Sequence, residues 1–182
     1  AKTFDIGELD GISTRTIEEH LGLYKGYVKH VNHIHEEMKN VNDAYAKAEM
    51  QRRLGFEFGG MKNHEYYFAQ FEGGAKECPE GSLKTLIEAN HTSVDEFIEH
   101  FKTLALTRGV GWAMCYIDRA ENQLVCAWVD EQHLGQLADV DIVLALDMWE
   151  HSYMIDYAPS EKKTYIDAFF KNLNWEVVAG RV

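Results

Sequence analysis

The length and composition of the chain fit one large domain or two small, closely packed ones. Its 182 residues are 46% hydrophobic, which is enough to form a sizeable core without cross-links. The formal net charge of −12 disfavours binding to nucleic acid or to anionic membrane surfaces, because both require clustered Lys and Arg. We therefore expect neither a nucleic acid nor a membrane as a partner.

The cysteines and the apolar runs indicate where the protein works. Cys78, Cys115 and Cys126 are odd in number and lack a Cys-x-x-Cys spacing, which argues against a disulfide framework and against a thiolate zinc site. No apolar run approaches the ~20 residues of a membrane helix, and residues 1–5 carry no hydrophobic signal core. We expect a cytoplasmic protein that is not exported.

Two long helices are predicted at the start of the chain. A helix-start signature at residues 13–19 is followed by apolar residues at the helical period. This pattern predicts a helix over residues 14–38 and a second over residues 42–70, loosened by glycines at 55 and at 59–60. The short link between them would make an antiparallel helical hairpin.

The strongest break in the sequence follows this hairpin, at Gly73-Gly74 and at the Cys-Pro-Glu-Gly of residues 78–81. We place a domain boundary there, which gives a helical hairpin domain at residues 1–74 and an α/β domain at residues 82–182. Helices are predicted next over residues 82–90 and, after a capping box at Ser93, up to residue 106.

The period then changes to that of strands. Residues 112–117 and 124–129 are rich in aromatic and branched side chains and flank a polar turn, which predicts a β-hairpin. Residues 142–146 predict a third strand that leads into Asp147, and residues 165–179 predict a closing helix. The fold class is therefore α+β: an N-terminal α-helical hairpin followed by a small α/β domain with a three-stranded antiparallel sheet.

Asp147 and His151 are four residues apart, so a helix there would present a carboxylate and an imidazole on one face. Such a pair alone is more often a hydrogen bond than a metal site. His20 and His64 lie mid-helix beside aromatic residues, where either could be a core histidine. Together the four would supply three imidazoles and one carboxylate, a set that suits iron or manganese better than structural zinc.

The other histidines give weaker signals. His133 follows the second predicted strand and is harder to dismiss than the rest. Five histidines are expected on solvated surfaces and are assigned no metal: His30, His33, His35, His91 and His100.

Several segments, in order and over most of the chain, resemble the iron/manganese superoxide dismutase family. Residues 147–153 resemble its Asp-x-Trp-Glu-His-x-Tyr signature, which carries the third and fourth metal ligands. Asn63-His64 with the aromatic residues after it resembles the second-ligand segment, and residues 17–28 resemble the first. Residues 109–112 and Asn174-Trp175 resemble the start of the family's sheet and its closing helix.

The resemblance implies a superoxide dismutase that converts superoxide to dioxygen and hydrogen peroxide at one iron or manganese ion per chain. The ligands implied are His20, His64, Asp147 and His151. Tyr27 would be the hydrogen-bonding gate of the substrate channel, and Trp149 would form part of its apolar wall. Tyr27 follows His20 by seven residues where the family usually has eight, so we expect a local change in helix geometry.

The family also places an amide beside the metal, and its position separates the two metals. Iron members commonly take it from the residue four before the second histidine, which is Gly60 here and has no side chain. Manganese members supply a glutamine from the sheet domain, at the place of Gln132, with His133 as a competitor. The pattern favours manganese, and dual use stays open.

A symmetric homodimer is implied as well. Glu150 would contact His151 of the partner subunit, and Tyr153 would reach the partner's first helix, where Tyr24 replaces the customary histidine. The altered Leu23-Tyr24 segment leaves one alternative open, a catalytically silent relative that binds metal or only dimerises. A non-redox metal hydrolase would need a general base that is not evident beside the four ligands.

Overall fold

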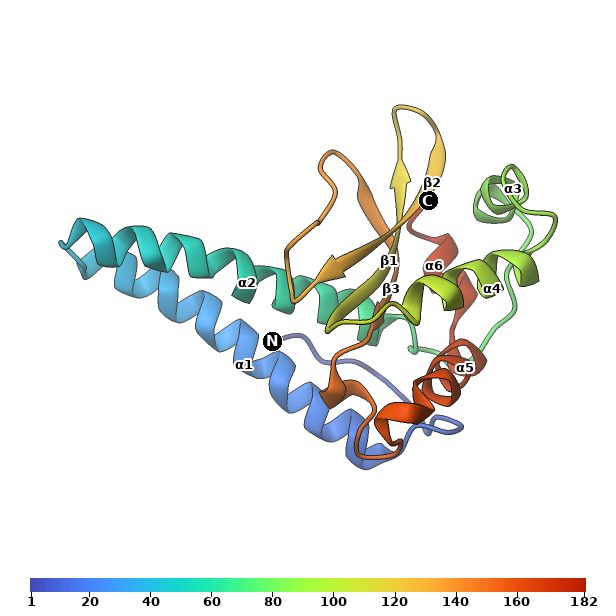
Figure 1. Ribbon diagram of the computed structural model, residues 1–182, viewed down its shortest axis with the longest axis horizontal. Helices are drawn as coiled ribbons and strands as arrows, with labels where there is room; N and C mark the ends of the chain where they lie inside the picture. The colour runs from blue at the N-terminus through green and yellow to red at the C-terminus, as the bar shows by residue number, and fades with distance from the viewer.

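Two long antiparallel helices, α1 (Thr14–Asn40) and α2 (Ala44–Ala69), form an arm that projects beyond the rest of the molecule in Figure 1. The computed structural model describes residues 1–182. Each helix begins at a side-chain cap, because Ser13 accepts a hydrogen bond from the Thr16 amide and Asp43 accepts one from the Ala46 amide. The hairpin predicted from the sequence is confirmed.

The glycines of α2 do not loosen it, and that part of the prediction was wrong. The helix is unbroken from Ala44 to Ala69. Gly59 and Gly60 are instead places of close approach, since a Cβ atom at Gly59 would overlap the Gln132 carbonyl and one at Gly60 would lie 2.5 Å from the Tyr27 ring. The glycines thus let other segments pack directly against α2.

The sheet has three antiparallel strands, β1 (Gly111–Asp118), β2 (Gln123–Asp130) and β3 (Asp141–Asp147), in the order β2-β1-β3. The central strand β1 is buried along nearly its whole length. Successive side chains of a strand point to opposite faces of the sheet. Trp112 therefore faces α2, where its ring lies 5.1 Å from the His64 ring, and the next residue faces the other way. The predicted α+β class and three-stranded sheet are confirmed.

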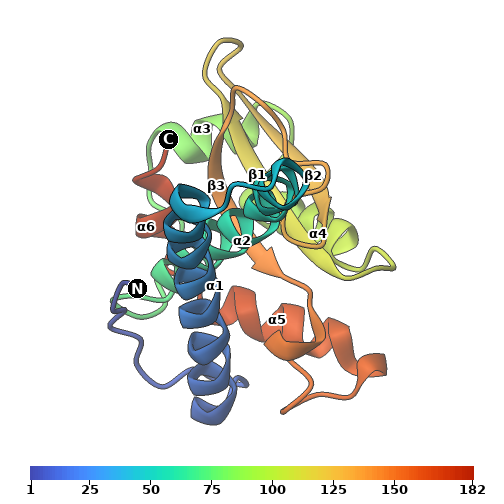
Figure 2. The same ribbon diagram turned by 90° about the vertical axis from the view of Figure 1, so that its left-hand side faces the viewer.

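The remaining helices are α3 (Ser82–Glu88), α4 (Val94–Ala105), α5 (Lys162–Asn172) and α6 (Trp175–Ala179). In Figures 1 and 2, α5 lies below the sheet, on the side on which α1 begins. The single closing helix predicted over residues 165–179 was wrong. Leu173 and Asn174 are extended between α5 and α6, because the Asn174 amide donates to the Gln70 carbonyl and its side chain donates to the Glu72 carbonyl.

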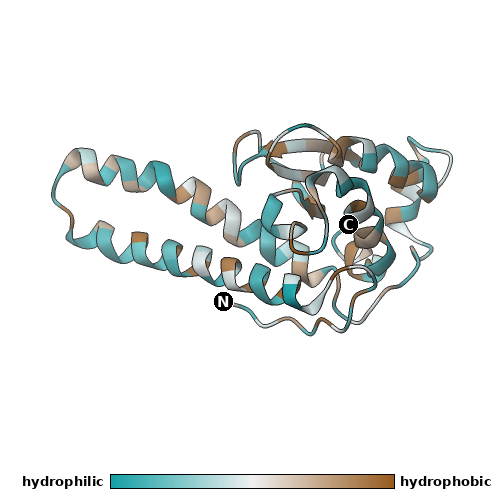
Figure 3. Cartoon of the chain, turned by 60° about the horizontal axis from the view of Figure 1, so that its bottom comes forward, coloured by the Kyte–Doolittle hydropathy of each residue, from teal (hydrophilic) through white to brown (hydrophobic).

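One hydrophobic core joins the helical hairpin to the sheet and its helices. Tyr67 and Phe68 of α2 pack with Trp112 of β1 and Phe169 of α5 in the same buried cluster. Hydrophilic segments dominate the projecting arm, as Figure 3 shows by colour. The chain has no helix with both the length and the apolar character that crossing a bilayer requires.

Candidate metal centre

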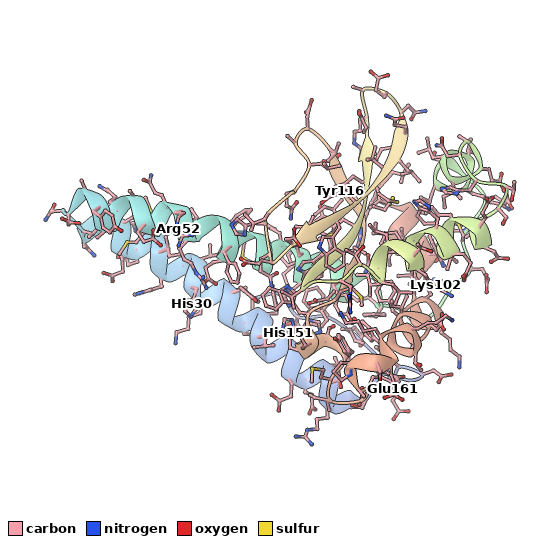
Figure 4. The ribbon with its side chains drawn as sticks, viewed as in Figure 1. His30, Arg52, Lys102, Tyr116, His151 and Glu161 are labelled. Atoms are coloured by element: carbon pink, nitrogen blue, oxygen red, sulfur yellow. The ribbon has the colours of Figure 1, made fainter.

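Four side chains from four separate elements meet at the inner end of the helical hairpin. They come from α1 (His20), α2 (His64), the last residue of β3 (Asp147) and the short 3₁₀ helix η1 (Glu150–Ser152), which carries His151. One potential ligand atom from each lies within 4.8 Å of all the others. The spacing predicted that Asp147 and His151 share a helix face, and this was wrong. A strand end and a 3₁₀ turn bring the two residues together. Figure 4 shows His151 between α1 and the strands.

Asp147 is at the centre of the cluster. Its Oδ2 atom lies 3.0 Å from His20 Nε2, 3.2 Å from His151 Nε2 and 3.5 Å from His64 Nε2. The other carboxylate oxygen, Oδ1, accepts a hydrogen bond of 2.8 Å from the Trp149 amide. This second bond fixes the plane of the carboxylate, so that one oxygen faces the three imidazoles.

The cluster contains a buried nitrogen without a hydrogen-bond partner, as a metal site requires. His64 has no exposed surface, and its Nδ1 atom lies 2.6 Å from the Gly60 carbonyl, to which it donates. In that tautomer Nε2 carries the lone pair, and this atom has no hydrogen-bond partner. A metal ion would supply the missing partner, and the bond to Gly60 would hold the ring in place for it.

The electrostatics favour the ligand forms of these groups. Burial lowers the pKa of His20 and lowers the pKa of His64 to about 3, so both imidazoles are neutral near pH 7. Burial by itself raises the pKa of Asp147, but His151 and His20 outweigh it and hold that pKa well below its ordinary value. The neutral imidazoles of His20 and His64 thus stand beside a carboxylate and a third histidine, a donor set that fits iron or manganese.

Two hydroxyl groups support Asp147 from behind, and no pattern in the sequence indicated this role. Tyr165 donates to the Asp147 backbone carbonyl at 2.9 Å, and Ser152 donates to the same carbonyl at 3.0 Å. Only the contact itself identifies them, because Tyr165 lies outside the segments that carry the ligands and Ser152 occupies a variable position of the signature at residues 147–153.

Gln132 connects the sheet to Tyr27. Its Nε2 atom donates to the Tyr27 hydroxyl at 2.9 Å, and its Oε1 atom accepts from Trp112 Nε1 at 2.9 Å. Asn63 donates to the Gln132 backbone carbonyl at 3.1 Å. Only one of the two Nε2 hydrogens is used by Tyr27, which leaves the second free for a molecule in the site.

His133 points away from this network. Its ring packs edge-on against Phe56, with centroids 5.9 Å apart, and lines a separate cavity between α2 and the segment that joins β2 to β3. The structure therefore brings Gln132, and not His133, to Tyr27.

Tyr27 and Trp149 flank the cluster. The Tyr27 ring lies 5.1 Å from the His64 ring, and Trp149 stacks on His151 at 5.7 Å with an angle of 20°. The helix α1 is continuous through His20 and Tyr27, so the expected local change in helix geometry was wrong. Seven residues are about two helical turns, which keeps both side chains on one face.

The residues predicted at a dimer interface differ in exposure. Glu150 is exposed, whereas Tyr153 is buried and packs against Tyr165 with ring centroids 5.4 Å apart. Tyr24 has no exposed surface, and its hydroxyl donates to Glu65 and accepts from the Lys2 amide. Its predicted contact with a partner subunit stays a prediction; within one chain the N-terminal segment covers this side of α1.

The histidines assigned to the surface lie outside the cluster. His91 is partly exposed, and its ring lies 5.3 Å from that of His100. The other four of the group are exposed: His30, His33, His35 and His100.

The fold and the cluster define a metal-binding α+β protein, and comparison with known proteins shows its family. Residues 79–181 match the sequence model of the iron/manganese superoxide dismutases, C-terminal domain. The superoxide dismutase (Fe) of Aquifex aeolicus is 34% identical over 183 residues, covering 95% of this chain and 85% of that protein. That of Cupriavidus metallidurans is 34% identical, with 96% and 90% covered. The superoxide dismutase (Mn) of Mycobacterium leprae is 28% identical, with 91% and 86% covered. The chain belongs to the iron/manganese superoxide dismutase family.

Proposed function

We propose that this protein is a superoxide dismutase that binds one iron or manganese ion through His20, His64, Asp147 and His151. The observation that carries the proposal is the convergence of these four ligand atoms within 4.8 Å in a chain of this family. When bound, such an ion exchanges one electron between its doubly and triply charged states, so that two superoxide ions and two protons give dioxygen and hydrogen peroxide.

The side chains around the ion supply position and protons. Burial raises the pKa of Tyr27, which keeps its hydroxyl protonated at neutral pH. The Gln132 amide holds that hydroxyl at 2.9 Å and is itself fixed by Trp112. Tyr27 thus serves as the gate from which a proton enters, and the indole of Trp149 over His151 restricts water beside the ligands.

We infer that manganese is favoured over iron. Gln132 is fully buried and reaches Tyr27, as an amide from the sheet side should. A glutamine at residue 60 would have to displace the Tyr27 ring. The names of the relatives include both metals, so metal analysis of the purified protein decides.

We also propose a symmetric homodimer through the surface beside η1. A recess there is lined by Glu150 and His151, with Leu23, Met154 and Ile155 as exposed apolar neighbours. Glu150 would then reach His151 of the partner subunit, and Tyr153 would lie at the same contact. A single species of monomer mass in sedimentation of the native protein would contradict the dimer.

We further propose a division of the chain into two domains and a location in a reducing compartment. The start of the family match at residue 79 supports a boundary between a hairpin domain at residues 1–74 and an α/β domain at residues 82–182. The three cysteines are free thiols, which supports a reducing compartment such as the cytoplasm.

The deciding experiment measures superoxide loss per bound metal ion in the purified protein. His64→Ala is expected to lose both metal and activity, whereas the matched variant His33→Ala, at an exposed position of α1, is expected to keep both. A His64→Ala protein with stoichiometric metal and full activity would overturn the ligand assignment. Stoichiometric metal without activity in the native protein would instead indicate a catalytically silent relative.

A further inference from the structure

Two of the three cysteines face each other across the sheet, away from the metal centre. Cys115 of β1 is directly opposite Cys126 of the edge strand β2. Both lie on the face opposite that of Trp112, which contacts His64. Their sheet neighbours on that face are apolar pairs, Ala113 with Trp128 and Ile117 with Leu124.

The hydrogen-bond pattern of β1 determines how close the two residues are. The Glu131 amide donates to the Val110 carbonyl, so even-numbered residues of β1 exchange hydrogen bonds with β2. The Met148 amide donates to the Gly111 carbonyl, so odd-numbered residues bond towards β3. Cys115 and Cys126 are therefore a non-hydrogen-bonded pair, the closer of the two antiparallel arrangements, with Cα atoms about 4.5 Å apart.

That spacing permits a direct covalent link. Disulfides span Cα distances of about 4.4–6.8 Å, so the two sulfur atoms can bond without a shift of register. The neighbouring Cys126 thiol, together with burial, raises the pKa of Cys115, whose own thiol donates to the Tyr116 carbonyl at 3.9 Å. Cys115 is fully buried, whereas Cys126 is half-buried on the edge strand and is the thiol that a reagent can reach.

We propose that Cys115 and Cys126 form a peroxide-sensitive dithiol that oxidises to a cross-strand disulfide. The oxidant is hydrogen peroxide, the product of the proposed dismutation.

The disulfide forms in two steps from one peroxide and two thiols. The Cys126 thiolate attacks one peroxide oxygen, the O–O bond breaks, and the released hydroxide takes a proton to become water. The Cys115 sulfur then attacks the sulfenic acid sulfur of Cys126 and displaces a second hydroxide, which is also protonated to water. Two thiols are oxidised to one disulfide, and one peroxide is reduced to two waters.

The experiment treats the metal-loaded protein with a molar excess of hydrogen peroxide. Free thiols are then alkylated in denaturant, and the protein is cleaved with trypsin without reduction. Arg119 lies between the two cysteines, so cleavage there leaves two peptides joined only by the disulfide. We expect this cross-linked pair, its loss on treatment with dithiothreitol, and alkylated Cys78. Alkylation of both Cys115 and Cys126, or a link from either to Cys78, would overturn the proposal.

Two variants and a second oxidant complete the test. Cys78→Ser is the matched control, because it removes a thiol outside the pair and should keep the cross-link. Cys126→Ser should abolish it. Diamide, which joins neighbouring thiols directly, should give the same link in the native protein, and oxidation of Cys126 to a sulfinic acid without a link would count against the proposal. Added peroxide makes the result independent of whether the chain removes superoxide.

Discussion

The ring of Tyr27 fills the space beside Gly60, so that a side chain at residue 60 and this ring exclude each other. A Cβ atom at Gly60 would lie 2.5 Å from Tyr27 Cδ1 and 2.6 Å from Cε1. The close approach brings the Tyr27 hydroxyl to the Gln132 amide on the far side of the site.

Gly60→Ala should displace the Tyr27 ring. We expect a loss of about 1–3 kcal/mol in the free energy of unfolding, from overpacking, together with reduced turnover. The matched variant is Gly26→Ala on α1, where a Cβ atom meets nothing within 4 Å. It should gain up to about 1 kcal/mol from helix propensity and keep its activity. Urea unfolding and the superoxide assay measure both, and equal effects of the two variants would contradict the argument.

Tyr27→Phe should keep the ring packing and remove only the hydroxyl. The free energy of unfolding should change by about 1 kcal/mol, since one hydrogen bond is lost. Turnover should fall by about 10-fold or more if the hydroxyl delivers protons. A large loss of stability with unchanged kinetics would show that Tyr27 is only a packing residue.

Gln132→Ala should lower activity far more than His133→Ala. Loss of a side chain that supports a metal site costs about 10–100-fold in activity or affinity. Gln132 bonds both Tyr27 and Trp112, whereas the His133 ring faces Phe56. Steady-state rates and metal content of the two variants test this, and the reverse order would assign the role to His133.

The metal-free protein should lose stability as the pH falls from 7 towards 5. An unfolded histidine binds a proton below about pH 6.5, whereas the pKa of His64 in the folded protein is about 3, and that of His20 is also lowered. Between these values the unfolded chain holds more protons, so protons favour unfolding. Below about pH 4 the lowered pKa of Asp147 adds to the loss.

Urea midpoints of the metal-free protein at pH 7 and pH 5 measure this slope. His64→Gln should flatten it, and His33→Gln, at an exposed position, should leave it unchanged. A midpoint that stays constant with pH in the native metal-free protein would contradict the prediction.

Local sequence patterns predicted correctly those helices and strands that tertiary contacts do not interrupt. The two long helices and the three strands show clear periods of apolar residues, and the structure contains them within a few residues of the predicted bounds. Tertiary contacts account for the errors. Asn174 bonds the carbonyls of Gln70 and Glu72, which interrupts a segment that is helical by period. Gly59 and Gly60 look like helix breakers until the segments that pack on them are known.

The site was predicted by resemblance more than by spacing. The interval between Asp147 and His151 suggested a helix, but the two residues lie on a strand end and a 3₁₀ turn. The choice between Gln132 and His133 depends on which of two adjacent side chains points inward, and a sequence count does not determine this. The hydroxyls of Tyr165 and Ser152 behind Asp147 had no signal at all.

The order of the four ligand positions along the chain restricts when the protein can acquire its metal. The chain is synthesised from its N-terminus, so His20 and His64 are made while Asp147 and His151, 127 and more residues after His20, do not yet exist. The complete donor set forms only when β3 joins the helical hairpin. Metal would therefore be captured only after His151 has been made and β3 has packed on the hairpin, and the ion that is abundant at that moment would compete for the site.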